Sequence, residues 1–191
     1  MTAILKVDTI QHTSGNNIIN ESSDTITIGA SGDTISIPSG ATIANSGTAT
    51  GFGKLLQVVN AKTNTQFNTT STSLVAVTNL SAAITPSATS SKILIMVNFT
   101  GTNATAGKTT NTTIYRGSTN LAMQSSTGIM GLFSNEASEY KGYSYHYLDT
   151  PSSTSALTYQ VYAMTDSGGT AQLMVNGNTA SITLMEIAGW L

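Results

Sequence analysis

The chain has 191 residues, of which 8% are charged and 6% aromatic, and it contains no cysteine, so disulfides are excluded. Its net charge is -2, without a basic run, so neither a nucleic-acid backbone nor an anionic membrane has an electrostatic reason to bind. We expect no nucleic-acid partner and no membrane insertion. Thr suits strands, whereas Asn, Ser and Gly suit turns, and the abundance of these residues predicts an all-β protein.

A near-repeat occupies the N-terminal quarter of the chain. Its Thr-Ile pairs begin at Thr25, Thr34 and Thr42, and turn sequences containing Gly or Pro separate them. This spacing predicts short strands joined by tight turns. Each strand supplies only two inward isoleucines, and a two-stranded ribbon is marginal in water. We therefore expect residues 21–53 to form an intertwined β stalk of several identical chains.

The composition changes at residues 51–54, after which aromatic residues, longer apolar runs and regularly spaced turns follow. Residues 54–191 are numerous enough for one β-sandwich, and the spacing of the turns favours a sandwich or a jelly roll. No segment predicts a helix. The expected strands are residues 55–60, 74–78, 81–85, 93–100, 112–116, 120–124, 128–133, 140–148, 157–164, 171–175 and 181–187.

Several predicted strands carry apolar residues on both faces. Ile93 and its alternate neighbours line one face of a strand while Leu94 and Met96 line the other, and residues 55–59, 173–175 and 182–187 are similar. A two-layer sandwich gives each strand one core face, so the second face needs either another subunit or a covering loop. The residues expected at a subunit contact are Leu55, Ile93, Leu94, Met96, Ile182, Leu184 and Met185.

Catalytic patterns are incomplete. The segment Thr-Asp-Ser-Gly-Gly at residues 165–169 resembles the nucleophile segment of chymotrypsin-like proteases. The only histidines, His12 and His146, lack the flanking residues expected of that family. A loop between two strands explains the segment more simply. Acidic residues are too few to suggest the carboxylate pair of a glycosidase. We expect no enzyme activity.

The acidic residues of the C-terminal part have structural interpretations. Asp149 precedes Thr150 and Pro151 and fits a turn, and Glu186 on the last expected strand fits a buried, paired charge. Two isolated histidines without cysteine do not make a transition-metal site. Loop oxygens near Asp149 or Asp166 leave a calcium site open, but no cofactor and no metal is assigned.

Two loops hold the side chains that surface recognition requires. They are residues 101–111 and residues 134–142, and loops on a rigid scaffold are a usual place for binding. Aromatic faces beside hydrogen-bonding groups suit a sugar, and the alternative is that these loops are merely solvated. The candidate receptor-binding residues are Asn135, Glu136, Glu139, Tyr140, Lys141 and Lys108.

Four sequence blocks resemble virion proteins of bacteriophages. MTAILKVDTIQHTSG at residues 1–15 looks like the start of many phage tail-fibre and related proteins, particularly marine and cyanobacterial ones. SAAITPSATSSKILI, YLDTPSSTSALTYQV and SITLMEI, at residues 81–95, 147–161 and 181–187, resemble the C-terminal domain often joined to it. The resemblance implies a trimeric fibre with an N-terminal attachment region, residues 1–20, and a jelly-roll head similar to tumour-necrosis-factor or C1q-like trimers. Three-fold symmetry comes from the resemblance, because the residues alone indicate only several chains.

Together these observations predict a homotrimeric virion fibre on a phage tail or capsid surface. Its N-terminus is expected to bind a tail or baseplate protein. Its head is expected to recognise a host surface receptor, a glycan in the first place, with avidity multiplying weak contacts. One alternative keeps the fold and makes the protein a structural fibre or decoration of the capsid. An alternative of another class is a polysaccharide-degrading enzyme.

Overall fold

The computed structural model describes residues 34, 36–42, 55–121 and 128–189, and the chain divides into two units, residues 1–49 and 50–191. In the first unit the described residues contain one tight turn, in which the Ala41 N–H donates to the Pro38 carbonyl at 3.1 Å. Gly40 has a φ of 86°, the left-handed conformation that the third position of a type II turn requires. The predicted turn at residues 38–40 is therefore present. Most of the predicted stalk and attachment region lies outside the described residues.

The second unit is an all-β sandwich, as the sequence predicts. Its described residues form eleven strands and one short 3-10 turn, η1 (Val175–Gly177), and none of its helices is long and apolar enough to cross a membrane. The strands are β1 (Leu55–Thr63), β2 (Phe67–Thr69), β3 (Val75–Ile84), β4 (Lys92–Asn103), β5 (Lys108–Arg116), β6 (Thr119–Asn120), β7 (Met130–Ser134), β8 (Lys141–Asp149), β9 (Leu157–Thr165), β10 (Ala171–Leu173) and β11 (Ala180–Ile187).

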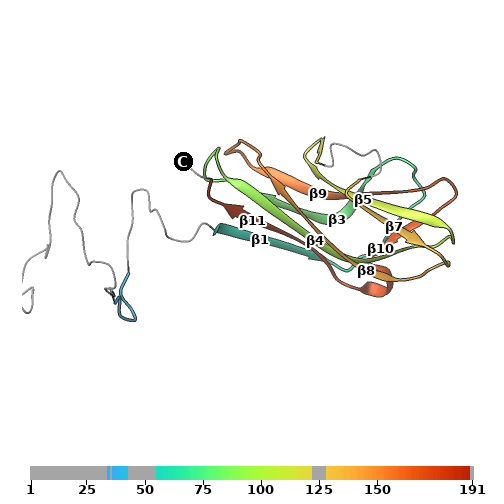
Figure 1. Cartoon of the computed structure of the whole chain (residues 1–191), viewed down its shortest axis with the longest axis horizontal. Coiled ribbons are helices and arrows are strands. Elements are labelled where there is room, and N and C mark those ends of the chain that lie inside the picture. The colour runs from blue at the N-terminus through green and yellow to red at the C-terminus, as the bar shows by residue number, and fades with distance from the viewer. Residues whose placement is uncertain (1–33, 35, 43–54, 122–127, 190–191) are drawn as a thin grey trace, which may run out of the picture. The chain divides into compact units, whose positions relative to one another are not determined.

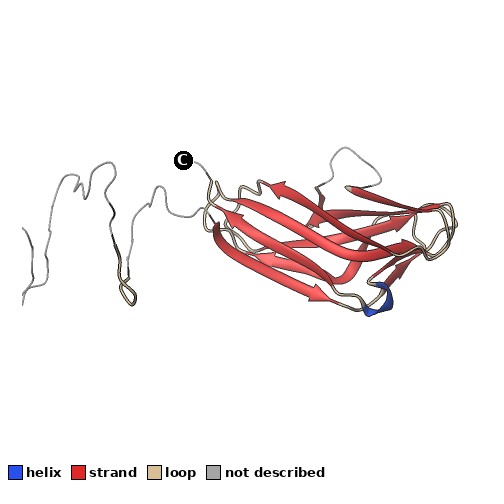
Figure 2. Ribbon diagram, turned by 60° about the horizontal axis from the view of Figure 1, so that its bottom comes forward, coloured by secondary structure: helices blue, strands red, loops and turns tan. Residues whose placement is uncertain are grey.

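Two antiparallel sheets face each other (Figures 1 and 2). We call them the β4 sheet, with the order β1-β11-β4-β8, and the β5 sheet, with the order β3-β9-β5-β7. The short strands β10 and β2 extend the β4 sheet, and β6 pairs with β5. The chain passes repeatedly from one sheet to the other, and this order of the eight main strands is that of a jelly roll.

Several predicted strands differ from the observed ones. The expected strand 112–116 begins earlier, at Lys108, and of the expected strand 120–124 the described residues contain only the end of β6, at Asn120. The expected strands 74–78 and 81–85 are one strand, β3, interrupted by a bulge at which Asn79 adopts a φ of 66°. The expected strand 171–175 ends at Leu173, because Met174 takes a left-handed conformation and η1 begins. The three-residue strand β2 has too short a pattern to be predicted from sequence.

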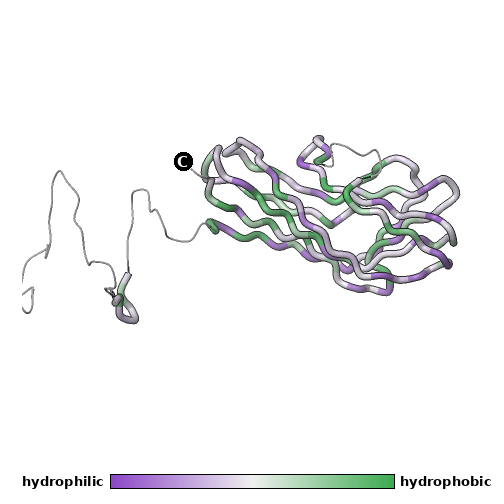
Figure 3. The backbone as a smooth tube through the Cα atoms, viewed as in Figure 1, coloured by the Kyte–Doolittle hydropathy of each residue, from purple (hydrophilic) through white to green (hydrophobic). Residues whose placement is uncertain are grey.

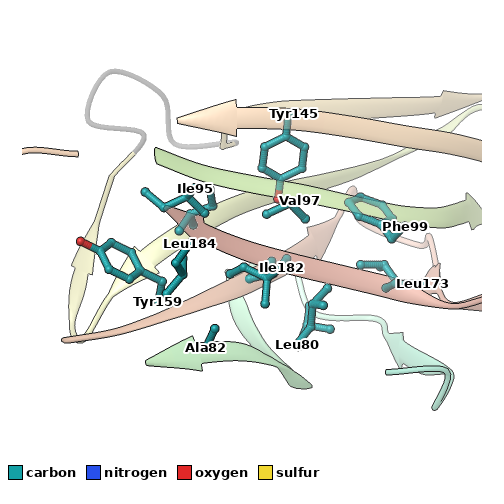
Figure 4. Packing of buried hydrophobic residues seen from close by; sticks show 14 of the residues in the cluster. Leu80, Ala82, Ile95, Val97, Phe99, Tyr145, Tyr159, Leu173, Ile182 and Leu184 are labelled. Carbon is teal, nitrogen blue, oxygen red and sulfur yellow. The ribbon is translucent and has the colours of Figure 1, made fainter. Parts of the chain in front are cut away.

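The core lies between the two sheets (Figure 4). Alternate residues of β4 point inward, among them Ile95, Val97 and Phe99, and they meet Val161 and Tyr159 of the β5 sheet. From Ile93 to Phe99 each inward position of β4 carries a branched or aromatic side chain that fits a pleated surface. The period-2 pattern of the sequence thus sets which side of each strand is buried.

The strand register defines two ends of the sandwich. At the end that we call proximal, β1 begins and β11 finishes, because Leu55 pairs with Ile187. At the opposite, distal end, β4 finishes and β5 begins. The first strand, β1, therefore enters the sandwich at the proximal end, and the connections β4–β5, β7–β8 and β9–β10 lie at the distal end.

Glu186 is a carboxylate buried at the proximal end, with no solvent exposure. Its Oε1 accepts hydrogen bonds from the Ser87 N–H, the Ser87 hydroxyl and the Ser91 hydroxyl, each at 2.7 Å, and its Oε2 accepts one from Gln57 at 2.6 Å. Burial by itself would raise the pKa of Glu186, but the hydrogen bonds from Ser87, Gln57 and Ser91 lower it to about 2. Glu186 therefore ties β11 to the start of β1 and to the β3–β4 connection.

Asp149 is a second buried carboxylate at the proximal end. It is the last residue of β8, and does not lie in the turn that the sequence suggested. Its Oδ2 accepts hydrogen bonds from Arg116 at 2.8 Å and from the Tyr159 hydroxyl at 2.7 Å. These contacts join β8 of the β4 sheet to β5 and β9 of the β5 sheet. Both carboxylate oxygens of Glu186 and the Oδ2 of Asp149 thus accept hydrogen bonds from protein donors.

We predict that Tyr159→Phe lowers the free energy of unfolding by about 2 kcal/mol, because it removes a hydrogen bond to a buried charged group. Urea denaturation at neutral pH and fixed protein concentration measures the effect. Tyr140→Phe is the matched control, since Tyr140 is half exposed and its variant should unfold like the wild type. A Tyr159→Phe midpoint equal to that of the wild type would contradict a stabilising role for this hydrogen bond.

Candidate interaction surfaces

The outer face of the β4 sheet carries a row of apolar side chains that crosses all four main strands. Val58 of β1 pairs with Met185 of β11, which pairs with Leu94 of β4, which pairs with Leu148 of β8. Each points away from the core, since its strand neighbours point inward. Val58 is 51% and Leu148 47% exposed. We call this row, together with Leu55, Leu56 and Met96, the apolar face.

The apolar face lies toward the proximal end, and polar residues follow it toward the distal end. Figure 3 colours the backbone of these strands by residue hydropathy. Further along the same strands, Asn60 donates to Thr183 at 2.7 Å, and Asn98 donates to Ser181 at 2.8 Å. These side chains are short and satisfy one another across the strands. The outer surface of the β4 sheet is therefore uncharged over most of its area and apolar at one end.

The structure divides the predicted contact residues into two groups. Leu55, Leu94, Met96 and Met185 lie on the outer face, as the double apolar pattern of their strands predicted. Ile93, Ile182 and Leu184 point into the core, where each has no solvent exposure. We therefore remove these three from the predicted contact set.

Three members of the apolar face, Leu56, Val58 and Leu148, were missing from the predicted set. Leu148 follows a run of alternating tyrosines, so its strand reads as having one solvent face. The pairing of Leu148 with Leu94 places Leu148 on the apolar face, and the sequence alone does not give this pairing.

Residues 173–175, by contrast, have no second apolar face, because the chain leaves the strand at Met174 and buries all three side chains.

The six candidate receptor-binding residues all lie at the distal end. Lys108 begins β5 and pairs with Ser134, which ends β7, so Lys108 lies beside the β7–β8 connection, which holds the other five with Lys141 as the first residue of β8. Tyr140 is 50% exposed. The neighbouring β4–β5 and β9–β10 connections meet there, since the Ala104 N–H donates to the Thr170 carbonyl at 2.9 Å.

Two charged side chains of the β7–β8 connection and its end, Glu139 and Lys141, form contacts within the protein that hold this segment in place. Glu139 pairs with Lys141 at 3.0 Å and accepts a hydrogen bond from the Asn135 N–H at 3.2 Å. The hydrogen bond from Lys141 is the main cause that lowers the pKa of Glu139. Lys141 also donates to the Phe133 carbonyl at 3.1 Å, which links β8 to β7. The donors and acceptors left for a ligand are therefore fewer than the sequence suggests.

The protease-like segment is the β9–β10 loop. The Gly169 N–H donates to the Asp166 carbonyl at 2.9 Å, and Gly168 has a φ of 78°, as expected of a tight turn. Asp166 accepts a hydrogen bond from the Thr109 N–H at 2.9 Å. His146 lies in the middle of β8 in the other sheet, opposite Met96. The structure does not bring His146 to this loop.

Comparison with known proteins gives only weak similarity. No protein-family model matches the chain, and neither does any curated protein. The structure of infectious bursal disease virus strain Gt aligns with 70% of this chain at 14% identity and a TM-score of 0.40. The VP2 subviral particle of the same virus aligns with 70% at 13% identity and a TM-score of 0.38. The alignments cover 38% and 37% of those chains, so the fold assignment rests on the strand order.

Proposed function

We propose that this protein is a homotrimeric fibre of a phage virion, attached through its N-terminal region and carrying a head that binds a host surface receptor. The observation that carries the proposal is the apolar face. Leu55, Leu56 and Val58 are each about half exposed on an isolated chain, at the end where the N-terminal unit joins. Contiguous exposed apolar residues of this kind mark interaction surfaces.

The occupant that we propose for the apolar face is a second copy of the same chain. The face has few charges, so it does not require a partner of complementary charge. The N-terminal repeat needs apolar surface from other chains for a separate reason, and its Ile37 is 48% exposed. Copies that associate through the repeat would bring their heads together at the proximal end. The number three comes from the resemblance to phage fibres.

The resemblance to phage fibre proteins also supports the virion location and the recognition role. In this arrangement the distal end points away from the site of attachment. Distal loops on a rigid sandwich are then the first surface to meet a cell. Three copies in each fibre would multiply modest affinities. The mechanism is adhesion without turnover.

Native mass measurement of the full-length chain tests the assembly. We expect a mass of three chains at micromolar concentration, and a monomer would contradict the proposal. An adsorption assay tests the role, because an excess of the free protein should compete with virions for host cells. A trimer that leaves adsorption unchanged would favour the capsid decoration. Products released from host polysaccharide would favour the enzyme.

A further inference from the structure

One of the two histidines of the chain lies beside the apolar face. His146 is exposed on β8 and points outward, because Tyr145 and Tyr147 on either side of it pack toward the core. It pairs with Met96 of β4 and stands two positions from Leu148 on its own strand, so roughly 7 Å separates those outward positions. Both of these neighbours belong to the apolar face. A contact that covers them therefore covers His146 as well.

No carboxylate points outward from the four main strands of the β4 sheet. These strands hold two acidic residues, Glu186 and Asp149, and both are buried and accept hydrogen bonds inside the protein. The charged side chains on the outer face are basic: Lys92 lies at the proximal end of β4, and Lys62 lies on β1 beyond the polar pair of Asn60 and Thr183. A positive charge on a histidine of this face would find no partner on its own chain or on the same face of a second copy.

The remaining acidic side chains of residues 54–191 lie at the distal end. Glu136 and Glu139 belong to the β7–β8 connection, and Asp166 accepts a hydrogen bond from the start of β5. The last charged residue of β8, Lys141, is already paired with Glu139 and lies five positions from His146, roughly 17 Å along the strand. Heads that pack side by side at the proximal end therefore offer His146 no carboxylate.

We propose that His146 makes the association of the heads depend on pH, so that they pack together when its imidazole is neutral and separate when it is protonated. This pH switch rests on the proposed homotrimer. Histidine is the side chain whose charge ordinarily changes between pH 5 and pH 8. A neutral imidazole can be buried against Met96 and Leu148, whereas a buried imidazolium loses its water and gains no partner.

The direction of the pH dependence follows from burial. Because the contact favours the neutral form of His146, separated heads bind more protons than assembled ones, and assembly is lost as the pH falls. Every copy in the trimer repeats this loss. The repeated positive charges also repel one another, and the outward lysines of the same face add to that repulsion.

Oxidation of Met96 by dilute hydrogen peroxide in the full-length protein tests the switch. Met96 is 41% exposed on a single head and is covered in the proposed contact, whereas Met174 has no exposure and serves as the internal reference. Peptide mass spectrometry at pH 7.5 and pH 5.5 gives both rates. We expect Met96 of the wild type to be oxidised severalfold faster at pH 5.5. His146→Gln, which stays neutral, should keep the slow rate at both pH values. His12→Gln removes the other histidine and is the matched control, which should respond to pH like the wild type.

Equal rates of Met96 oxidation in the wild type at the two pH values would overturn the switch, and so would an acid response of His146→Gln as large as that of the wild type. Native mass measurement at pH 7.5 reports the assembly separately. A trimer whose Met96 rate ignores pH would leave the fibre proposal standing without the switch. A monomer at pH 7.5 would contradict the fibre proposal and the switch together.

Discussion

Glu186→Gln is expected to lower the free energy of unfolding of the head by about 3 kcal/mol at neutral pH. The pKa of Glu186 is about 2 in the folded protein, against an ordinary value of 4.5, and this difference corresponds to the stated loss. Gln places an NH₂ group where the carboxylate now receives hydrogen bonds from Ser87 and Gln57. Urea denaturation at a fixed protein concentration measures the loss, because assembly shifts apparent stability by mass action.

The same carboxylate predicts how stability depends on pH. Because the folded-state pKa of Glu186 is lowered, its contribution is fully present above about pH 4.5 and is lost as the pH falls toward about 2. The wild type should therefore lose stability across this window, and Glu186→Gln should lose less. Glu136→Gln is the matched control, since Glu136 is exposed in the β7–β8 connection. Identical pH profiles for the wild type and Glu186→Gln would refute this account.

Two charges on the apolar face should prevent assembly of the heads. We expect the double variant Val58→Asp and Met96→Asp to bring the full-length chain from three copies to one at micromolar concentration. Both side chains point outward, and burying unpaired carboxylates against another chain costs several kcal/mol. Each 1.4 kcal/mol weakens association tenfold. Native mass measurement shows the change.

Thr158→Asp, on the exposed outer face of the β5 sheet, is the matched control for this variant. It adds a carboxylate away from the apolar face and should remain trimeric. Near-ultraviolet circular dichroism should show that the double variant keeps a folded head, since neither substitution enters the core. A double variant that stays trimeric would show that the apolar face is not the contact.

The sequence predicted the class of the fold because strand alternation is a local property. In β4 the pattern distinguishes Ile93 and Ile95 from Leu94 and Met96, and the structure places the two sets on opposite faces. What the pattern cannot give is which face turns inward. Both faces of this strand are apolar, so Ile93 was predicted at a subunit contact although it lies in the core.

The candidate sites depended on long-range register, which single strands do not reveal. Leu148 joins the apolar face only because β8 pairs with β4. The candidate receptor-binding residues of the β7–β8 connection were predictable because charged and aromatic residues cluster there in the sequence itself.

The pairing of β1 with β11 has a mechanical consequence. The N-terminal unit joins at the first residue of β1, and the β1–β11 ladder runs from Leu55 to Thr63 along the strand direction. A pull on Leu55 directed along β1 and away from the head therefore loads the whole ladder in shear, instead of opening its hydrogen bonds one at a time. Glu186 reinforces the end that is loaded first, through its hydrogen bond with Gln57. A head held at its distal end would thus meet tension in the direction in which a β-sheet resists it best.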